Sequence, residues 1–367
     1  MPEPHEFLAT LLQRGHQAFA AMATVEFLAA RPAAAAHLGA DPTAVWREWF
    51  TERVEELSVA VAAAKSEIFV QQVSWAVALL AARGVAMTDL EAALECFREV
   101  LQRELPAAMR GAVDEYICDA FAALDAAGGS QDEPLTADTD AGKLAATYLL
   151  KLLQGDRREA VSLIHDTAAK GWRVADLYAQ ILIPAQREVG RMWASDEINV
   201  AEEHLATSTT KMLMSQLCGR AEARSLNQKV VVAATVPRDQ HDVGLQMVTE
   251  FFDMDGWRTV PLGANVPTPD LLQAIEAFQA DLLLLSASLN KHLLAVRDTI
   301  LAIRQYPATQ HVKILVGGSA FTGVADLAER FGADGYAATA GEAVQIGKGL
   351  VGLKTGADMS QSPADSR

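Results

Sequence analysis

The chain has 367 residues, enough for two or three domains that each bury a core of their own. Its formal net charge of -16 opposes sequence-independent binding to a phosphate backbone, so we expect no direct contact with nucleic acid. Hydrophobic residues make up 50% of the chain and aromatic residues only 6%, which is typical of a helix-rich globular protein.

The sequence also bears on the compartment. No apolar run is long enough to span a bilayer, and the segment 1–6 lacks the basic residues and apolar stretch of a signal peptide. Neither a paired cysteine framework nor a C-x-x-C site is present, so reduced core thiols are expected at Cys96, Cys118 and Cys218. These features predict a cytoplasmic protein without membrane contact.

Residues 1–124 predict an all-helical domain, because apolar residues recur at helical spacing between short breaks. No basic recognition helix of the kind used by DNA readers is present. Histidines and aromatic residues in this region could line a planar chromophore. The alternative is that the aromatic residues form the core and the histidines lie at the surface. The residues in question are His5, His16, His37, Trp46, Trp49, Trp75 and Tyr116.

Residues 125–141 are small, polar and acidic, the composition of a flexible linker. The next region, 142–225, separates into four helical stretches joined by short connections, which predicts an up-and-down four-helix bundle. The expected helices span 144–153, 157–169, 174–193 and 200–223.

Three side chains near the last connection of this bundle are candidate ligand-binding residues. Trp193 closes the third helix, and Glu203 and His204 stand in the first turns of the fourth. The short connection brings them toward one end of the bundle, where they could cover a flat ligand. The alternative is a core tryptophan beside an exposed Glu-His pair.

Residues 226–354 alternate apolar strands with amphipathic helices, which predicts a five-stranded parallel sheet of the flavodoxin-like kind. The small, polar tail at 355–367 is expected to be disordered. The strands are expected at 229–236, 258–262, 281–286, 312–316 and 334–338.

The first strand runs into a loop with the pattern D-x-H-x-x-G, formed by Asp239, His241 and Gly244. Loops of this kind lie at the carboxyl edge of a parallel sheet, where ligands bind. A neutral imidazole can offer one ring nitrogen to a metal when a carboxylate holds the other, and Asp239 is the candidate holder. Gly244 leaves room for something bulky near the backbone. A solvated loop with a surface histidine is the alternative.

Small residues follow two later strands, Ser286 and Ser288 after the third and Gly317 and Gly318 after the fourth. They stand at the same edge of the predicted sheet as the D-x-H-x-x-G loop. Together they predict a slot into which a long ligand tail could pass.

In this order, D-x-H-x-x-G, S-x-S and G-G resemble the cobalamin-binding domain shared by corrinoid methyltransfer proteins, mutases and cobalamin photoreceptors, over roughly residues 226–354. The resemblance implies that His241 replaces the dimethylbenzimidazole as lower axial ligand of cobalt, with Asp239 behind it. The displaced nucleotide tail would enter the slot. The slot residues implied are Gly244, Ser286, Ser288, Gly317 and Gly318.

Trp193, nine intervening residues and then Glu203-His204 are similar to the cap of light-sensing, adenosylcobalamin-binding regulators, in which these side chains border the adenosyl group. DNA-binding members of that family carry a histidine directly after the tryptophan, whereas this chain has Ala194. The difference puts a stable bis-histidine light product in doubt, with His204 as the substitute. The helical first domain, for which a globin-like fold is expected, looks instead like that of the photocobilins, which binds a linear tetrapyrrole such as biliverdin.

The leading hypothesis is therefore a light sensor that is not an enzyme and that binds adenosylcobalamin. Light would break the cobalt-carbon bond, and loss of the adenosyl group would repack the cap and change an interface between protomers. This mechanism implies a homo-oligomer and a downstream protein partner. The second hypothesis is a corrinoid protein that carries a methyl group between methyltransferases, for which the upper face of the cofactor must stay open.

Overall fold

The computed structural model describes residues 4–35, 41–126, 135–219 and 225–354. Contacts within the chain divide it into two units. The first comprises residues 1–134 together with 190–199, and the second comprises 135–189 together with 200–367. Within the described ranges no helix is both long and apolar enough to cross a membrane.

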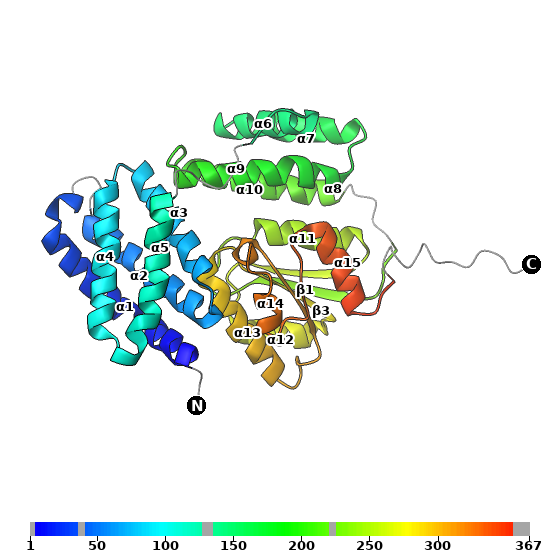
Figure 1. Cartoon of the computed structure of the whole chain (residues 1–367). Coiled ribbons are helices and arrows are strands. Elements are labelled where there is room, and N and C mark those ends of the chain that lie inside the picture. The colour runs from blue at the N-terminus through cyan, green and yellow to red at the C-terminus, as the bar shows by residue number, and fades with distance from the viewer. Residues whose placement is uncertain (1–3, 36–40, 127–134, 220–224, 355–367) are drawn as a thin grey trace, which may run out of the picture. The chain divides into compact units, whose positions relative to one another are not determined.

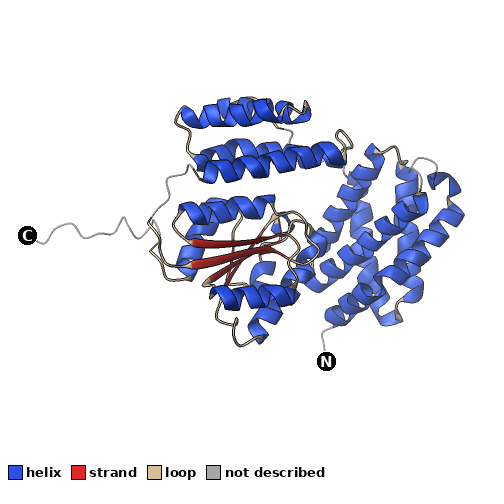
Figure 2. Ribbon diagram, turned by 180° about the vertical axis from the view of Figure 1, so that it is seen from behind, coloured by secondary structure: helices blue, strands red, loops and turns tan. Residues whose placement is uncertain are grey.

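The first unit is helical throughout its described residues (Figures 1 and 2). The expected helical amino-terminal region is thereby confirmed, whereas a globin-like arrangement stays a prediction. Helix α1 packs along α2, and α2 packs on α3. The elements are α1 (Pro4–Ala30), the 3-10 helix η1 (Pro32–Ala35), α2 (Pro42–Ala63), α3 (Ser66–Ala82), α4 (Met87–Glu104) and α5 (Ala107–Ala126).

Aromatic side chains form much of the core of this unit. The Phe27 and Trp46 rings lie 4.4 Å apart between centroids, and Trp49 meets Phe50 edge-on at 5.0 Å. Trp46, Trp49 and Tyr116 are buried against other side chains, whereas Trp75 and His5 are exposed and His16 is partly exposed. This packing agrees with the alternative in which the aromatic residues form the core. His37 lies outside the described residues.

The second unit begins with helices that pack on one another: α6 contacts α7, the segment η2 and α10. The helix expected over 174–193 is interrupted by a π-helical turn, for which Pro184 supplies a reason. Proline has no N–H and its ring crowds the carbonyl four residues earlier, and the wider turn relieves that crowding. The elements are α6 (Asp140–Leu153), α7 (Arg157–Ala169), α8 (Val174–Leu177), η2 (Tyr178–Leu182), α9 (Ile183–Ala194) and α10 (Val200–Cys218).

The start of the first helix in this unit differs from the expected one. Helix α6 starts at Asp140 because the Thr139 hydroxyl accepts a hydrogen bond of 3.0 Å from the Gly142 amide and caps the first turn. Of the linker expected at 125–141, residues 127–134 lie outside the described residues, and so does the tail at 355–367.

The rest of the second unit is a five-stranded, wholly parallel sheet in the order β2-β1-β3-β4-β5. This is the flavodoxin-like order, so the predicted α/β architecture is confirmed. The sequence overestimated the last strand, which pairs through only two residues. The strands are β1 (Val230–Thr235), β2 (Arg258–Gly263), β3 (Leu282–Ser286), β4 (Lys313–Gly317) and β5 (Gly335–Tyr336).

Helices cover both faces of this sheet. Figure 1 shows α11 and α15 on one face and α12 and α13 on the other, and α10 contacts α11 from above. Under α11 and α15 lies an apolar core that includes Phe252, Trp257 and Leu282. The helical elements are α11 (Val243–Met254), α12 (Thr268–Phe278), η3 (Asn290–His292), α13 (Leu293–Gln305), η4 (Ser319–Phe321), α14 (Leu327–Arg330) and α15 (Ala340–Leu350).

Candidate functional site

The loop between β1 and α11 is fixed by hydrogen bonds from both sides. The Thr235 hydroxyl, at the end of β1, donates to the Asp239 carbonyl at 2.6 Å and accepts from the Asn265 amide at 2.8 Å. Arg238 has a left-handed backbone with φ 72, and its amide donates to the Asn265 side chain at 2.6 Å. These bonds hold the loop so that Asp239 and His241 lie at the carboxyl edge of the sheet.

The Asp239 carboxylate is fully buried and accepts hydrogen bonds from two loops. Its Oδ1 accepts from the ring Nδ1 of His241 at 2.8 Å and from the His241 amide at 3.0 Å. Its Oδ2 accepts from the Ser288 amide at 2.7 Å. Burial alone would raise the pKa of Asp239, but these hydrogen bonds hold it well below its usual range. Asp239 is therefore ionised, and it joins the loops after β1 and β3.

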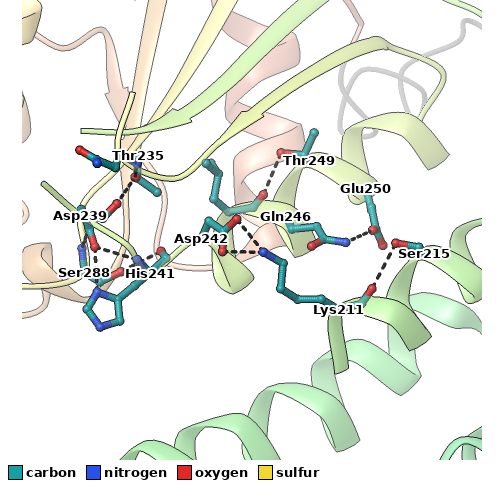
Figure 3. A network of polar contacts seen from close by, with 12 residues as sticks. Lys211, Ser215, Thr235, Asp239, His241, Asp242, Gln246, Thr249, Glu250 and Ser288 are labelled. Carbon is teal, nitrogen blue, oxygen red and sulfur yellow. Dashed lines mark hydrogen bonds and ion pairs between the residues drawn. The ribbon is translucent and has the colours of Figure 1, made fainter. Parts of the chain in front are cut away.

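The His241 ring is oriented by this carboxylate. Because Nδ1 donates to Asp239, the neutral ring carries its lone pair on Nε2. The side chain is 59% exposed, so this nitrogen can be reached from outside. The hydrogen bond to Asp239 outweighs burial and raises the pKa of His241. In Figure 3 the ring lies on the side of the loop away from Asp242.

A second histidine faces the same carboxylate and was not among the predicted site residues. His292, in η3, is buried, and its Nδ1 lies 3.5 Å from Oδ2 of Asp239. Among the residues that the structure describes, this Nδ1 has no hydrogen-bond partner. The one sequence signal for His292 was its position shortly after the S-x-S pattern, which places it close to the carboxyl end of β3.

The predicted slot residues lie at the ends of β3 and β4, where Ser286 pairs with Gly317 in the register of the sheet. Gly318 has φ 99, and a Cβ there would lie 2.2 Å from the Ala287 carbonyl oxygen, so only glycine fits. The Ser288 hydroxyl donates to the His241 carbonyl at 3.3 Å and so links the end of β3 to the His241 loop.

Gly244 differs from these glycines because the space around it is open. A Cβ built there would meet nothing within 4 Å. The space next to the first turn of α11 is therefore free of protein atoms, as a ligand close to the backbone would require.

The Glu203-His204 pair lies in the first turns of α10. Glu203 Oε2 is 2.5 Å from His204 Nδ1, and Glu203 Oε1 accepts from the Thr207 hydroxyl at 2.7 Å. His204 is 75% exposed. After the hydrogen bond to Asp239, the Glu203 charge is among the causes of the raised pKa of His241. Trp193 lies partly exposed in the last turn of α9, and a position beside Glu203 stays a prediction.

The helices above the sheet are tied to it by polar contacts that the sequence did not predict. The Tyr178 hydroxyl, in η2, hydrogen bonds to Glu250 of α11 and lies 2.8 Å from the Met214 carbonyl. Burial raises the pKa of Glu250 despite this contact. Lys211 of α10 pairs with Asp242, the residue after His241.

These residues suit a cobalt corrinoid. An exposed imidazole nitrogen, backed by an ionised carboxylate, is a suitable donor for a transition metal. Open space at Gly244 and a glycine-only approach at Gly318 provide room along the sheet edge.

Comparison with known proteins bears on this assignment. Two models of the B12 binding domain match the chain, one at residues 229–345 and a second at 144–217. The chain is 32% identical to "Dimethylamine corrinoid protein 3" of Methanosarcina mazei over 122 residues, which covers 33% of this chain and 72% of that protein. The chain belongs to the B12-binding protein family. Cobalamin is thus its cofactor class.

Other relatives extend over more of the chain. It is 29% identical to the "HTH-type transcriptional repressor CarH" of Myxococcus xanthus over 195 residues, 53% of this chain and 62% of that protein. A solved structure, the monomethylamine corrinoid protein of Methanosarcina barkeri, matches with a TM-score of 0.50 and 20% identity, over 56% of this chain and 96% of that one. The solved structure supports the fold alone.

The names of these two B12-binding relatives agree with the expectation that the chain is not itself an enzyme, because they designate a corrinoid protein and a repressor. The adenosyl form of the cofactor, a light response and biliverdin binding stay predictions. So do the roles of the individual site residues.

Proposed function

We propose that this B12-binding protein is a light sensor that holds adenosylcobalamin between the His241 loop and α10. The observation that supports it best is the Glu203-His204 pair in the first turns of α10, in which Thr207 fixes the Glu203 carboxylate. A pair of ordered polar side chains opposite the lower ligand suits a cofactor with a large upper group. A bare methyl group would need no such wall.

The residues have distinct tasks in this proposal. His241 holds the cobalt from below through Nε2, and Asp239 keeps Nδ1 protonated and the ring in place. Glu203 and His204 would border the upper face, and Trp193 is the third residue predicted to do so. The bound cofactor supplies a cobalt-carbon bond that light can break.

Signalling follows from the same arrangement. When the upper group is gone, nothing fills the space that Glu203 borders, and α10 can shift toward the sheet. We propose that this shift changes an interface in a homo-oligomer and is read by a downstream protein partner, with no direct contact to nucleic acid or membrane.

The experiment compares absorption spectra and oligomeric state before and after green light. The full-length protein is loaded with adenosylcobalamin or with methylcobalamin in the dark, and each sample is divided between illumination and darkness. We expect tighter binding of the adenosyl form, a light-dependent spectral change and a change in elution volume on size exclusion. Equal affinity for both forms, with no change in elution after illumination, would refute the sensor.

The second candidate function is a corrinoid carrier of methyl groups. The name of the Methanosarcina mazei relative favours it. A carrier must expose the upper face of its cofactor to two partners, so it predicts equal or better binding of methylcobalamin. The same comparison of the two cofactor forms therefore separates the candidates.

For the first unit we propose biliverdin as a second chromophore. Two buried donors, Trp49 Nε1 and Arg53 Nη1, have no hydrogen-bond partner among the described residues, and a carboxylate is an acceptor that suits them. The competing role is a docking domain with a filled core, in which ordered water satisfies these donors. Titration of biliverdin into the cobalamin-loaded protein decides: a red absorption band supports the chromophore, and its absence leaves docking.

A further inference from the structure

Asp242 directly precedes α11 but does not cap it. An aspartate at the N-cap usually accepts a hydrogen bond from the second or third amide of its helix. Here no such side-chain bond is present, although the Asp242 carbonyl accepts the ordinary helical bond from the Gln246 amide at 2.8 Å. Both carboxylate oxygens instead accept from Lys211 Nζ, at 2.9 and 2.8 Å.

Lys211 therefore links two separate elements. It projects from α10, while Asp242 adjoins His241 in the loop after β1 (Figure 3). The pair is partly shielded, with side-chain exposures of 35% for Lys211 and 18% for Asp242.

The position of Lys211 on α10 adds a second argument. Glu203, Thr207 and Lys211 are spaced by four residues and share one face of the helix. With a rise of about 1.5 Å per residue, Glu203 lies roughly 12 Å along the axis from the point at which Lys211 is anchored. The ion pair thus fixes which part of α10 lies above the loop.

The packing beside the ion pair is incomplete. A half-open pocket of about 430 Å³ lies between parts of α10, α11 and β2, lined by Ser215 and Cys218 of α10 and by Gln246 and Glu250 of α11. Close-packed side chains would fix the distance between helices, but a cavity leaves it adjustable. Specific polar contacts are left to set the spacing here.

We propose that Lys211 is a positioning residue of the cobalamin site, which holds α10, and with it Glu203, in register with His241. The effect on the upper face rests on the proposed function, whereas the effect on the His241 loop needs only cobalamin binding. Loss of the ion pair frees Asp242 to cap α11 and releases α10 over the cavity.

The test compares Lys211→Met with a matched control in the full-length protein. Methionine keeps the length and helix propensity but removes the charge. The control is Lys229→Met, which removes a similar pair: Lys229 lies 2.8 Å from Asp281, with exposures of 31% and 28%, at the opposite edge of the sheet. Dissociation constants for adenosylcobalamin and methylcobalamin and the melting temperature without cofactor are measured for each.

We expect Lys211→Met to lower the preference for adenosylcobalamin by about 5-fold, the lower end of usual coupling between sites. Lys229→Met should leave the preference for adenosylcobalamin unchanged, although it should lower the melting temperature as much as Lys211→Met does. Lys211→Arg should restore the preference, because its guanidinium can donate to both oxygens of Asp242.

A Lys211→Met preference equal to that of Lys229→Met would overturn the proposal. A parent protein without any preference would refute the shielded upper face instead. The role of Lys211 would then be tested by the affinity for methylcobalamin alone. Lys211→Met must lower this affinity, and Lys229→Met must leave it unchanged.

Discussion

Replacement of Asp239 by asparagine separates the two tasks of this carboxylate. Asp239 orients the His241 ring and also joins the loops after β1 and β3 through the Ser288 amide. Asparagine has nearly the same shape but one acceptor oxygen and one donor group in place of two acceptors. In either orientation of the substituted side-chain amide, its NH2 group faces another donor, either the Ser288 N–H or the two N–H groups of His241. One set of donors then loses its acceptor.

The cost follows from burial and from the number of bonds. Asp239 is fully buried, so water cannot replace a lost acceptor. A hydrogen bond to a charged group contributes about 1.5 to 3 kcal/mol, and a buried donor without a partner costs about 1 to 3 kcal/mol more. We expect Asp239→Asn to lower the free energy of unfolding of the sheet domain by about 2 to 5 kcal/mol. His241→Ala removes one such bond while the backbone amide still donates to the same oxygen, so it should cost about 1.5 to 3 kcal/mol.

Cobalamin affinity should follow the opposite order. His241→Ala removes the donor to cobalt and should weaken binding more than Asp239→Asn, which disturbs only the support and should cost about 10- to 100-fold. Hydrogen exchange at the amides of β1 and β3 gives the stability of this domain apart from the helical unit. Titrations monitored by absorbance give the affinity and show whether a histidine ligates the cobalt.

Asp281→Asn is the matched control for this comparison. Asp281 accepts from the Val230 amide at 2.9 Å and from Lys229, but it lies at the other edge of the sheet and is partly exposed. It should lower stability less and leave the affinity alone. If Asp239→Asn is as stable as the parent, or if His241→Ala binds cobalamin with parental affinity and spectrum, the reasoning is wrong.

Three further predictions concern other parts of the molecule. Gly318→Ala should cost about 1 to 3 kcal/mol in unfolding free energy, because its backbone has φ 99, whereas Gly244→Ala should lower cobalamin affinity without lowering the melting temperature. Trp193→Ala should reduce the preference for adenosylcobalamin; equal preference in parent and variant would favour the methyl carrier. Burial alone would raise the pKa of Asp334, but hydrogen bonds keep that pKa below its ordinary value. The ionised Asp334 therefore stabilises the fold fully above about pH 4, and this stabilisation is lost on further acidification. Asp334→Asn should flatten that acid limb in urea unfolding from pH 7 to 3.

The sheet could be predicted because its signals are local. A continuous β-branched run before D-x-H-x-x-G and a leucine run before S-x-S each indicate a buried strand, and the spacing of two between Asp239 and His241 brings carboxylate and ring together. The two-residue β5 was overestimated because its length depends on pairing with β4, which the sequence of the strand does not record.

The contacts that complete the site are long-range and leave little trace in the sequence. Ser288 is separated from Asp239 by 49 residues and Lys211 from Asp242 by 31, so no periodicity links them. Ser288 stays a predicted slot residue, and its amide and hydroxyl also hold the loop, which the sequence did not indicate. The π-helical turn had a local signal in Pro184, inside an otherwise helical pattern.

The two aspartates that flank His241 show why residue type alone does not assign a role. Asp239 is buried and ionised and holds the ring, whereas Asp242 is partly exposed and holds Lys211 of α10. Their side chains are chemically identical, and burial and the neighbouring donors separate their tasks. His241 is thereby bracketed by one contact to the sheet and one to the helices above. A displacement of its backbone would act on both contacts, and in the proposed function this is the route from cobalt to α10.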